Sequence, residues 1–385
     1  MEQTSETRSS GGLPGFYRPE LDSLRFFAFF MVFLSHSARF LPAGYFPERI
    51  GRAIHATLST GIWGVDLFFV LSAYLITELL RREKEATGKV HIGSFYARRV
   101  LRIWPLYFLV IAIGYVAQFV WSSQHLPANY ILWFLFLGGN WVCAIHGLPR
   151  SIIAPLWSVS IEEQFYMSWP WVVRNLELRW IRNVALLLLI GPTITRAYLA
   201  GHQYSYVMLG TNTFSRLDPI LAGILLSTCL RGRTFNLSRG ARVGMFATAL
   251  LALVLANKIL HVPAMEKTTF LDALLMFPLA ALLVSVIFVS ALGAPDAGVR
   301  WTAWPLLKYL GRISYGLYAF HRLCFVIAES AFGATQGLAH YFVIVAAGLG
   351  LTIVLAAASY RFFESPFLRL KERFTYIPSE RVGGA

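Results

Sequence analysis

The sequence predicts an all-α fold, a polytopic transmembrane helical bundle with about ten spans and one re-entrant segment. Three observations predict it: an apolar composition, a series of apolar stretches of membrane-spanning length, and basic residues gathered between those stretches. Of the 385 residues, 56% are hydrophobic and 14% are charged, whereas about a quarter of the residues of a soluble domain are charged. A water-soluble protein of this length cannot bury so much apolar surface in its core.

The apolar stretches approach the roughly 20 residues that a helix needs to cross a bilayer. Eleven candidates follow one another, and they are 21–41, 58–80, 101–121, 131–146, 155–172, 183–200, 217–230, 243–260, 269–292, 309–329 and 340–362. If all of them crossed, the basic segments 81–102 and 173–182 would lie on opposite sides, against the tendency of Arg and Lys to stay in cytoplasmic loops. We therefore expect one segment between 131 and 172 to enter the membrane without crossing it.

Ten crossings place both termini in the cytoplasm. We expect a cytoplasmic N-terminal tail over 1–20, one membrane domain over 21–366 and a cytoplasmic C-terminal tail over 367–385. The arginines of the loop 39–57 are the exception to this charge pattern. The net charge of +14 thus indicates membrane topology, and we expect no nucleic-acid partner.

Motifs of several common enzyme classes are missing from the sequence. It contains no GxxxxGK[ST] loop, HExxH pair, GxSxG elbow or CxxC pair, so nucleotide hydrolysis, zinc proteolysis and the common serine hydrolase arrangement have no support. Cys143, Cys229 and Cys324 lie in apolar runs without paired spacing, which argues against a disulfide framework or a zinc site. We expect no bound metal.

Polar side chains inside the apolar stretches are candidates for function, because charge is costly in hydrocarbon. Arg25 and His36 in LDSLRFFAFFMVFLSHSARF share one helix face about 16 Å apart. An imidazole titrates near neutrality and suits a buried base, with Arg25 at a cationic entrance from the cytoplasm. The alternative is a snorkelling arginine and a histidine bonded to a backbone carbonyl.

A basic run, SFYARRVLRIWP, places Arg98, Arg99 and Arg102 within about one helical turn of one another at an expected cytoplasmic helix end. Such a cluster can bind phosphates bidentately. Arginines at this position are also ordinary membrane topology, so the run alone leaves both interpretations open.

Two adjacent carboxylates, Glu162 and Glu163, lie among aromatic residues in WSVSIEEQFYMSWP. On a helix Glu162 and Tyr166 lie one turn apart, while Glu163 points about 100° away. An interfacial ion pair with a loop arginine is the alternative to a functional carboxylate.

Two further polar clusters occur later in the chain. Arg216 and Asp218 in TFSRLDPILAG precede a span on the expected outer side, where they would contact an acceptor or a lipid headgroup, or form a simple surface ion pair. Ser314, Tyr318 and His321 in LGRISYGLYAFHRLCF share a helix face.

Two classes of function fit these residues. Buried His and Glu behind a basic cytoplasmic entrance fit the transfer of a group from a phosphate-bearing cytoplasmic donor to a hydroxyl. They also fit a proton-coupled membrane transporter in which His36 and Glu162 form a proton relay. Composition does not separate the two.

The motifs resemble those of the membrane acyltransferase-3 family, the bacterial O-acyltransferases that modify O-antigen, Nod factors, macrolides and other glycans. The resemblance runs from about Leu21 to Pro366, with the motifs in the family's order. The matching segments are Arg25 to His36, GVDLFFVLSAYLIT, Arg99 with Arg102 and Pro105, WSVSIEEQFY, FSRLDPILAG, LGRISYGLYAFH and FFESP. Ala73 stands where the family usually has a glycine after Ser72. The resemblance ends near Pro366 with no esterase-like domain in the sequence, so we expect a standalone transferase.

The resemblance implies O-acyl transfer, most often of acetyl, in the bacterial cytoplasmic membrane. Acyl-CoA, with acetyl-CoA as first choice, is then a co-substrate, and no tightly bound cofactor is expected. The acceptor is a carbohydrate-containing molecule, either a glycan or a glycosylated small molecule. The oligomeric state is left open.

In the implied mechanism CoA phosphates lie on Arg98, Arg99 and Arg102. His36 acts as general base on the acceptor hydroxyl or, alternatively, carries the acyl group covalently. Glu162 orients or charge-stabilises its imidazole, and Arg25 guards the passage inward. The candidates for oxyanion stabilisation or acceptor binding are Ser72, Arg216, Asp218, Ser314, Tyr318 and His321.

Overall fold

The computed structural model describes residues 16–377 except 43, 261–268, 295, 298, 300–301, 303 and 334–336. Over these residues every regular element is a helix, so the predicted all-α class is confirmed. Residues 1–15 and 378–385, which belong to the two expected tails, lie outside the described residues.

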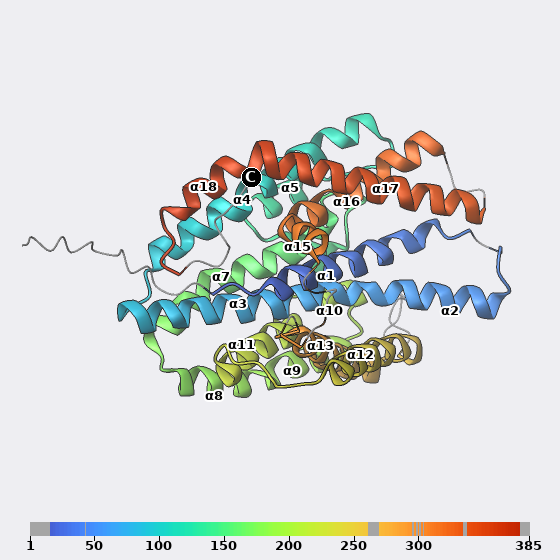
Figure 1. Cartoon of the computed structure of the whole chain (residues 1–385). Coiled ribbons are helices and arrows are strands. Elements are labelled where there is room, and N and C mark those ends of the chain that lie inside the picture. Colours follow the sequence, from blue (N-terminus) through green and yellow to red (C-terminus); the bar gives the residue numbers. More distant parts are fainter. Residues whose placement is uncertain are drawn as a thin grey trace, which may run out of the picture.

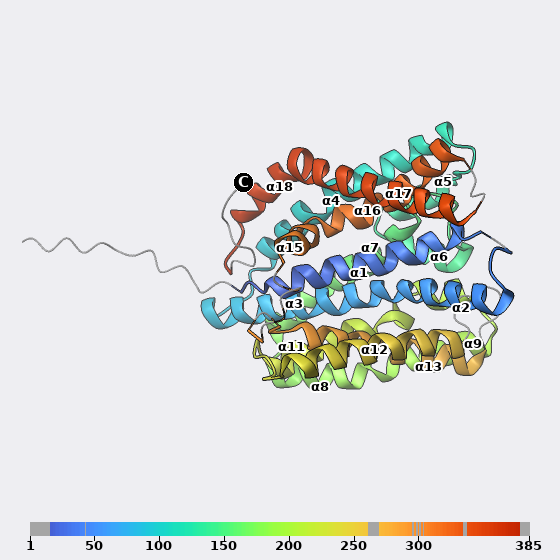
Figure 2. The same ribbon diagram turned by 45° about the vertical axis from the view of Figure 1, so that its right-hand side comes forward.

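Two helices form the centre of the bundle. α1 (Pro19–Ser37) and α3 (Gly64–Thr87) lie side by side along its length (Figures 1 and 2). Each contributes apolar side chains to two separate hydrophobic cores: in α1, Phe29 and Phe33 belong to one core, Leu24 and Ala28 to the other. α1 and α3 therefore form a wall between two packed groups of helices.

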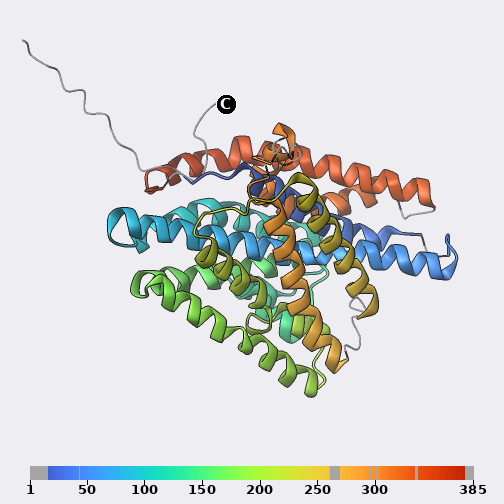
Figure 3. The ribbon, with the colours of Figure 1, turned by 60° about the horizontal axis from the view of Figure 1, so that its bottom comes forward.

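The two groups flank this wall. On one side lie α4 (Ile92–Val120), α7 (Trp157–Asn175), α15 (Pro305–Arg312), α16 (Ser314–Phe332) and α17 (Leu338–Ala358). On the other, in the foreground of Figure 3, lie α8 (Leu178–Leu188), α9 (Ile190–Gly201), α10 (Tyr206–Thr211), α11 (Asp218–Leu230), α12 (Arg239–Ile259) and α13 (Phe270–Ala291). The chain ends in a π-helical turn (Ser359–Glu364) and α18 (Ser365–Glu372).

Six helices of the described chain are long and apolar enough to cross a membrane. They are Glu48–Thr87, Ile92–Val120, Leu178–Gly201, Arg239–Ile259, Phe270–Ala291 and Leu338–Glu372. α11 is apolar but has 13 residues. Six helices could therefore span a membrane, which supports the predicted class, while the expected number of about ten crossings stays a prediction.

The segment expected to contain an incomplete crossing has no single long helix at 131–146. α5 (Ala128–Leu135) and α6 (Gly139–His146) have 8 residues each, about 12 Å, which is less than half of the roughly 30 Å of a hydrocarbon core. Leu137 between them takes a left-handed backbone conformation with φ 58°, which is typical of the residue that follows a helix C-terminus. Neither helix crosses a bilayer by itself.

The basic loop 39–57 is explained by its secondary structure. Its second half forms α2 (Glu48–Ser59), which continues through a 3-10 turn (Thr60–Trp63) into α3 as one helical run of 40 residues. Such a run is about 60 Å long, twice the hydrocarbon thickness, and α2 projects at one end of the bundle (Figure 1). Arg52 is exposed on α2, so its charge lies outside the apolar layer.

Small residues let the central helices approach closely, as is common in membrane bundles. A Cβ at Gly223 of α11 would lie 2.9 Å from the Cβ of Ala73 and closer still to the carbonyl oxygen of Val70. The close approach of α3 and α11 therefore tolerates Ala73, because the glycine stands on the opposite helix.

Candidate functional site

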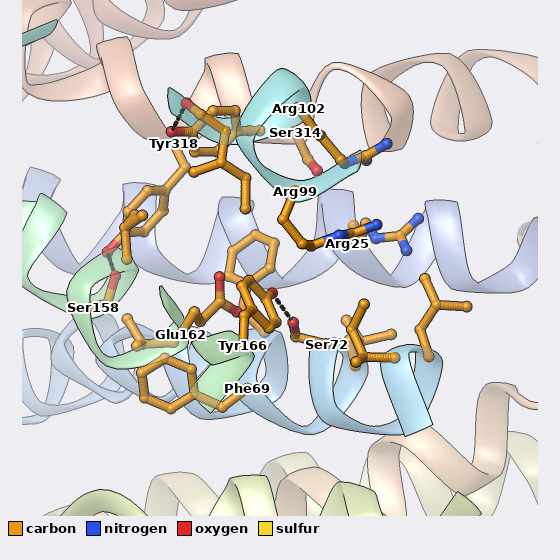
Figure 4. A pocket seen from close by; sticks show the side chains of 18 of the residues that line it. Arg25, Phe69, Ser72, Arg99, Arg102, Ser158, Glu162, Tyr166, Ser314 and Tyr318 are labelled. Atoms are coloured by element: carbon orange, nitrogen blue, oxygen red, sulfur yellow. Dashed lines mark hydrogen bonds between the residues drawn. The ribbon is translucent and has the colours of Figure 1, made fainter. Parts of the chain in front are cut away.

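Two cavities lie at opposite ends of α1. The first, the arginine cavity, has a volume of about 130 Å³ and is bounded by α1, α3, α4, α7 and α16. Its polar lining consists of Arg25, Ser72, Arg99, Arg102, Ser158, Glu162, Tyr166, Ser314, Tyr315 and Tyr318. Seven of the twelve site residues predicted from sequence thus meet in one cavity, although they come from five helices (Figure 4).

Three guanidinium groups gather at one end of this cavity, and Ser158 and Tyr318 lie at the other (Figure 4). Arg25 is held by an ion pair with Asp22 at 2.5 Å. The Arg99 guanidinium lies 5.7 Å from the ring centroid of Tyr166, and its Nε is buried without a hydrogen-bond partner. The arrangement is a positively charged pocket that suits a phosphate-bearing ligand.

Arg98 does not join this group. It donates hydrogen bonds to Glu83 Oε2 at 2.9 Å and to the carbonyl oxygen of Phe374 at 2.6 Å, and it does not line the cavity. Consecutive helical residues point about 100° apart, so Arg98 faces away when Arg99 faces inward. Arg98 ties α3 and α4 to the C-terminal segment, so the structure does not bring it together with Arg99 and Arg102.

The two adjacent glutamates also separate. Glu162 lies in the arginine cavity beside Tyr166, whose hydroxyl is hydrogen-bonded to Ser72 (Figure 4). Glu163 points towards α4, where it accepts a hydrogen bond from Trp104 Nε1 at 3.0 Å. Only Glu162 of the pair can therefore meet a ligand in this cavity.

The second cavity, the histidine cavity, has a volume of about 400 Å³. Its polar lining includes Ser35, His36, Arg39, His55, Ser59, Trp157, Asn257, Tyr318 and Arg322. Tyr318 and Val65 line both cavities, so a thin layer of side chains separates them. The Tyr318 hydroxyl donates to the carbonyl oxygen of Pro155 at 3.0 Å and lies 2.8 Å from Ser158 Oγ.

His36 is hydrogen-bonded to the second membrane-depth histidine. His36 Nδ1 lies 2.8 Å from His321 Nε2, and His321 Nδ1 lies 2.6 Å from the carbonyl oxygen of Tyr318. A carbonyl can only accept, so His321 Nδ1 carries a proton and, in a neutral ring, its Nε2 accepts from His36 Nδ1. This assignment leaves the lone pair of His36 on Nε2.

Glu162 is therefore not the hydrogen-bond partner of His36, contrary to expectation. His36 lines the histidine cavity, whereas Glu162 lines the arginine cavity. The orienting contact comes instead from His321, which is fully buried. Sequence spacing identified both histidines but not their pairing, because it depends on the packing of α1 against α16.

Arg216 and Asp218 form neither a surface pair nor part of either cavity lining. Arg216 pairs with Asp66 at 2.7 Å, and Asp218 binds Arg196 through two contacts of 2.5 and 3.1 Å. All four side chains are buried. The two expected site residues thus belong to buried ion pairs that join α3, α9, the 3-10 turn Phe214–Arg216 and the start of α11, and the structure places them away from the surface and from both cavities.

The sequence did not identify several residues of the histidine cavity and of the buried ion pairs. They are Arg39, His55, Asp66, Arg196, Asn257 and Arg322. Asp66, Arg196 and Arg322 are lone charges within apolar stretches, the same signal that identified Arg25. Among the described residues, no group of three His, Cys, Asp or Glu side chains is arranged to hold a metal ion.

Comparison with known proteins adds independent information. The family model described as an acyltransferase domain, Acyl_transf_3, matches residues 18–361. The peptidoglycan O-acetyltransferase OatA of Listeria monocytogenes is 28% identical over 331 residues, which cover 80% of this chain and 51% of the relative. The O-acetyltransferase OatA of Staphylococcus aureus is 28% identical over 387 residues, which cover 95% of this chain and 60% of the relative.

The chain spans about 60% of the length of the first curated relatives that it matches. No solved structure matches it significantly.

Proposed function

Because the chain belongs to the acyltransferase-3 family, we propose that it is a membrane O-acyltransferase that moves an acetyl group from acetyl-CoA to a hydroxyl of a carbohydrate-containing acceptor. The observation that carries this proposal is the pair of cavities that share Tyr318, one lined by arginines and the other by His36. In this arrangement donor and acceptor enter from opposite ends and meet at Tyr318.

The donor end is the arginine cavity. Arg25, Arg99 and Arg102 would bind the phosphates of CoA, because guanidinium groups bind phosphate oxygens bidentately. The apolar lining from α3, including Phe68 and Leu75, would surround the uncharged arm that carries the thioester. The thioester would then lie near Ser158 and Tyr318, at the far end from the arginines.

His36 is the proposed general base. The lone pair on its Nε2 would take the proton of the acceptor hydroxyl while the hydroxyl oxygen attacks the thioester carbonyl. The tetrahedral intermediate collapses by breaking the carbon–sulfur bond, and the CoA thiolate takes up the proton, so the products are an O-acetyl ester and CoA thiol. His321 is a positioning residue, since it fixes the tautomer of His36.

Tyr318 is the best placed of the candidate oxyanion donors, because its side chain lines both cavities, where donor and acceptor would meet. Its hydroxyl proton is donated to the carbonyl oxygen of Pro155 in the structure, so this role requires the hydroxyl to turn to the oxyanion during the reaction. Ser72 is hydrogen-bonded to Tyr166 and lies nearer the arginine end of the cavity (Figure 4). Ser314 lines the same cavity and is the better candidate for a donor contact.

The proposed topology has ten crossings in the bacterial cytoplasmic membrane. The crossing helices are α1, α3, α4, α7, the α8–α9 unit, α11, α12, α13, α16 and α17, and the α5–α6 segment enters without crossing. The basic ends of α3 and α4 then face the cytoplasm with the tails 1–20 and 367–385, on either side of a membrane domain over 21–366. The arginine cavity opens on the side where CoA is found.

The alternative, a proton-coupled transporter, has less support. A relay from His36 to Glu162 needs a continuous hydrogen-bonded path, but the two side chains line different cavities and His36 is bonded to His321.

Proteoliposomes containing the full chain test the proposal. With acetyl-CoA and isolated cell-envelope glycans we expect acceptor-dependent release of CoA thiol and acetyl esters by mass spectrometry. Proton-coupled solute uptake without release of CoA would contradict it. Mass spectrometry of glycans from cells with and without the gene then identifies the acceptor.

A further inference from the structure

We propose that the acceptor carries an anionic group, a carboxylate or a phosphate, which Arg39 and Arg322 bind in the histidine cavity. The inference rests on the proposed function, because it concerns the second substrate of that reaction. It adds a chemical property of the acceptor that the acyl-transfer chemistry does not require, since a hydroxyl alone is sufficient for esterification.

The charge of the cavity lining is the first observation. Two guanidinium groups, those of Arg39 and Arg322, line the cavity together with His36 and His55, and none of its described lining residues is Asp or Glu. Arg39 forms an ion pair with Glu329 at 3.3 Å, and the Glu329 side chain is 48% exposed. Two arginines line the cavity and one exposed carboxylate pairs with one of them, so the lining carries a net positive charge.

The state of Arg322 is the second observation. Within the described part of the chain no ion pair or hydrogen bond involves Arg322, and its Nε is buried without an acceptor. Arg39, besides its ion pair with Glu329, stacks on Phe40, with its guanidinium 4.4 Å from the ring centroid. Arg322 as a whole is half-buried and lines the cavity, so a ligand that supplies an anion gains from pairing with a guanidinium that has no counter-ion among the described residues.

The position of the two arginines connects this charge to the reaction. Arg322 follows His321 directly on α16, and Arg39 lies one helical turn after His36 at the end of α1. A cavity of about 400 Å³ is within the usual size range of small-ligand sites. An anion held by both arginines would place a neighbouring hydroxyl of the same sugar unit beside His36.

Oxyanion stabilisation is the competing role for these arginines, and it has a different kinetic signature. A group that stabilises the transition state of acyl transfer affects kcat with every acceptor. A group that binds an anion on the acceptor affects KM, and only with acceptors that carry the anion. Matched acceptor pairs separate the two.

The experiment uses the full chain in proteoliposomes with acetyl-CoA and two matched pairs of acceptors. The first pair is the disaccharide of N-acetylglucosamine and N-acetylmuramic acid, with its free lactyl carboxylate, against its methyl ester. The second is polyprenyl-pyrophosphate-linked N-acetylglucosamine against the neutral polyprenyl glycoside of the same sugar. The two pairs distinguish a carboxylate from a phosphate as the source of the anion.

We expect the anionic member of one pair to be preferred about tenfold or more in kcat/KM, through KM. Arg39→Gln and Arg322→Gln should reduce this preference towards one, and Arg322→Lys should keep part of it. Arg52→Gln, which removes an exposed arginine of α2, is the matched control and should leave the preference unchanged.

Equal use of both members of each pair, or a preference that survives both glutamine variants, would overturn the proposal. So would an equal loss of kcat with anionic and neutral acceptors, which would assign the arginines to the transition state.

If none of the four acceptors is acetylated, the proposed function fails for these acceptors. The proposed anion site is then tested separately, by measuring acceptor binding with calorimetry. Tighter binding of the free carboxylate than of the methyl ester, lost in Arg322→Gln, would support the site. Equal binding would overturn it.

Discussion

His36 Nδ1 and His321 Nε2 lie 2.8 Å apart although the two residues are separated by 285 positions in the chain. The contact joins α1 to α16 at the cavity where we place the acceptor. Because His321 is itself anchored on the carbonyl oxygen of Tyr318, the His36 ring has one defined tautomer when both rings are neutral. His36, His321 and the backbone carbonyl of Tyr318 therefore form one hydrogen-bonded chain.

Replacing His36 with Ala should reduce kcat at least about 100-fold, because general base catalysis typically contributes that much or more. CoA thiol release in proteoliposomes measures the rate. Expression and acetyl-CoA binding by calorimetry should be retained, since His36 does not line the arginine cavity. Full activity of this variant would refute the mechanism.

His321 should behave as a positioning residue. In His321→Gln the amide oxygen can still accept a proton from His36 Nδ1, whereas His321→Ala removes the acceptor. We expect the alanine variant to lose more of kcat than the glutamine variant, with an unchanged KM for acetyl-CoA. Equal rates in both variants would show that the hydrogen bond has no role in orienting His36.

Arg99→Gln and Arg102→Gln should each raise the KM for acetyl-CoA about 10- to 100-fold, because each removes a charged contact to phosphate, worth about 1.5–3 kcal/mol. Arg98→Gln should leave this KM near the wild-type value, since Arg98 is engaged with Glu83 and Phe374. Arg179→Gln, at an exposed site, is a charge-matched control. An equal effect of all four substitutions would indicate nonspecific electrostatic attraction.

The buried ion pair between Arg216 and Asp66 should contribute strongly to the integrity of the bundle. Asp66→Asn or Arg216→Gln alone leaves a buried charge unpaired and should cost about 3–5 kcal/mol. The double variant should cost less than the sum of the single ones. Thermal unfolding in detergent measures the effect, and the exposed pair of Arg52 and Glu48, 3.7 Å apart, provides a control substitution that should lower stability by less than about 1 kcal/mol.

Gly223→Ala should destabilise the protein by about 1–3 kcal/mol, as overpacking does in a tight core. The added methyl group would overlap the Val70 carbonyl oxygen and Ala73. Gly244→Ala, in α12 with nothing near the added Cβ, should be neutral or stabilising by about 0.4–1 kcal/mol. A thermal melt in which both variants match the wild type would show that α3 and α11 separate easily.

The class of fold is predictable from sequence because each segment can be interpreted by its own composition. The length and hydrophobicity of an apolar stretch predict a membrane span, and the charge of an arginine cluster predicts the side of the membrane on which it lies. The same locality identified Arg25, His36, Glu162 and Tyr318, since a polar group in an apolar run is conspicuous whatever its neighbours are.

Partners between helices are not predictable in this way. The sequence left two alternatives for Arg216, contact with an acceptor or headgroup and a surface ion pair with Asp218 two positions away, yet Arg216 pairs with Asp66, 150 positions away. An ion pair with either aspartate satisfies the local pattern, and only the packing of α3 against α11 decides between them. The same reason explains why Arg98 and Arg99, adjacent in sequence, face different surroundings, and why Glu162 does not contact His36.

Among the described lining residues, Val65 and Tyr318 are shared by the two cavities, and the others belong to one cavity or the other. Substitutions at His55 or Asn257 can therefore change which acceptor is used without altering the surfaces proposed to hold CoA. With this division, substitutions can alter the histidine cavity, where we propose that the acceptor binds, while the arginine cavity is kept for the donor. Either cavity can then be changed separately, in evolution or by design.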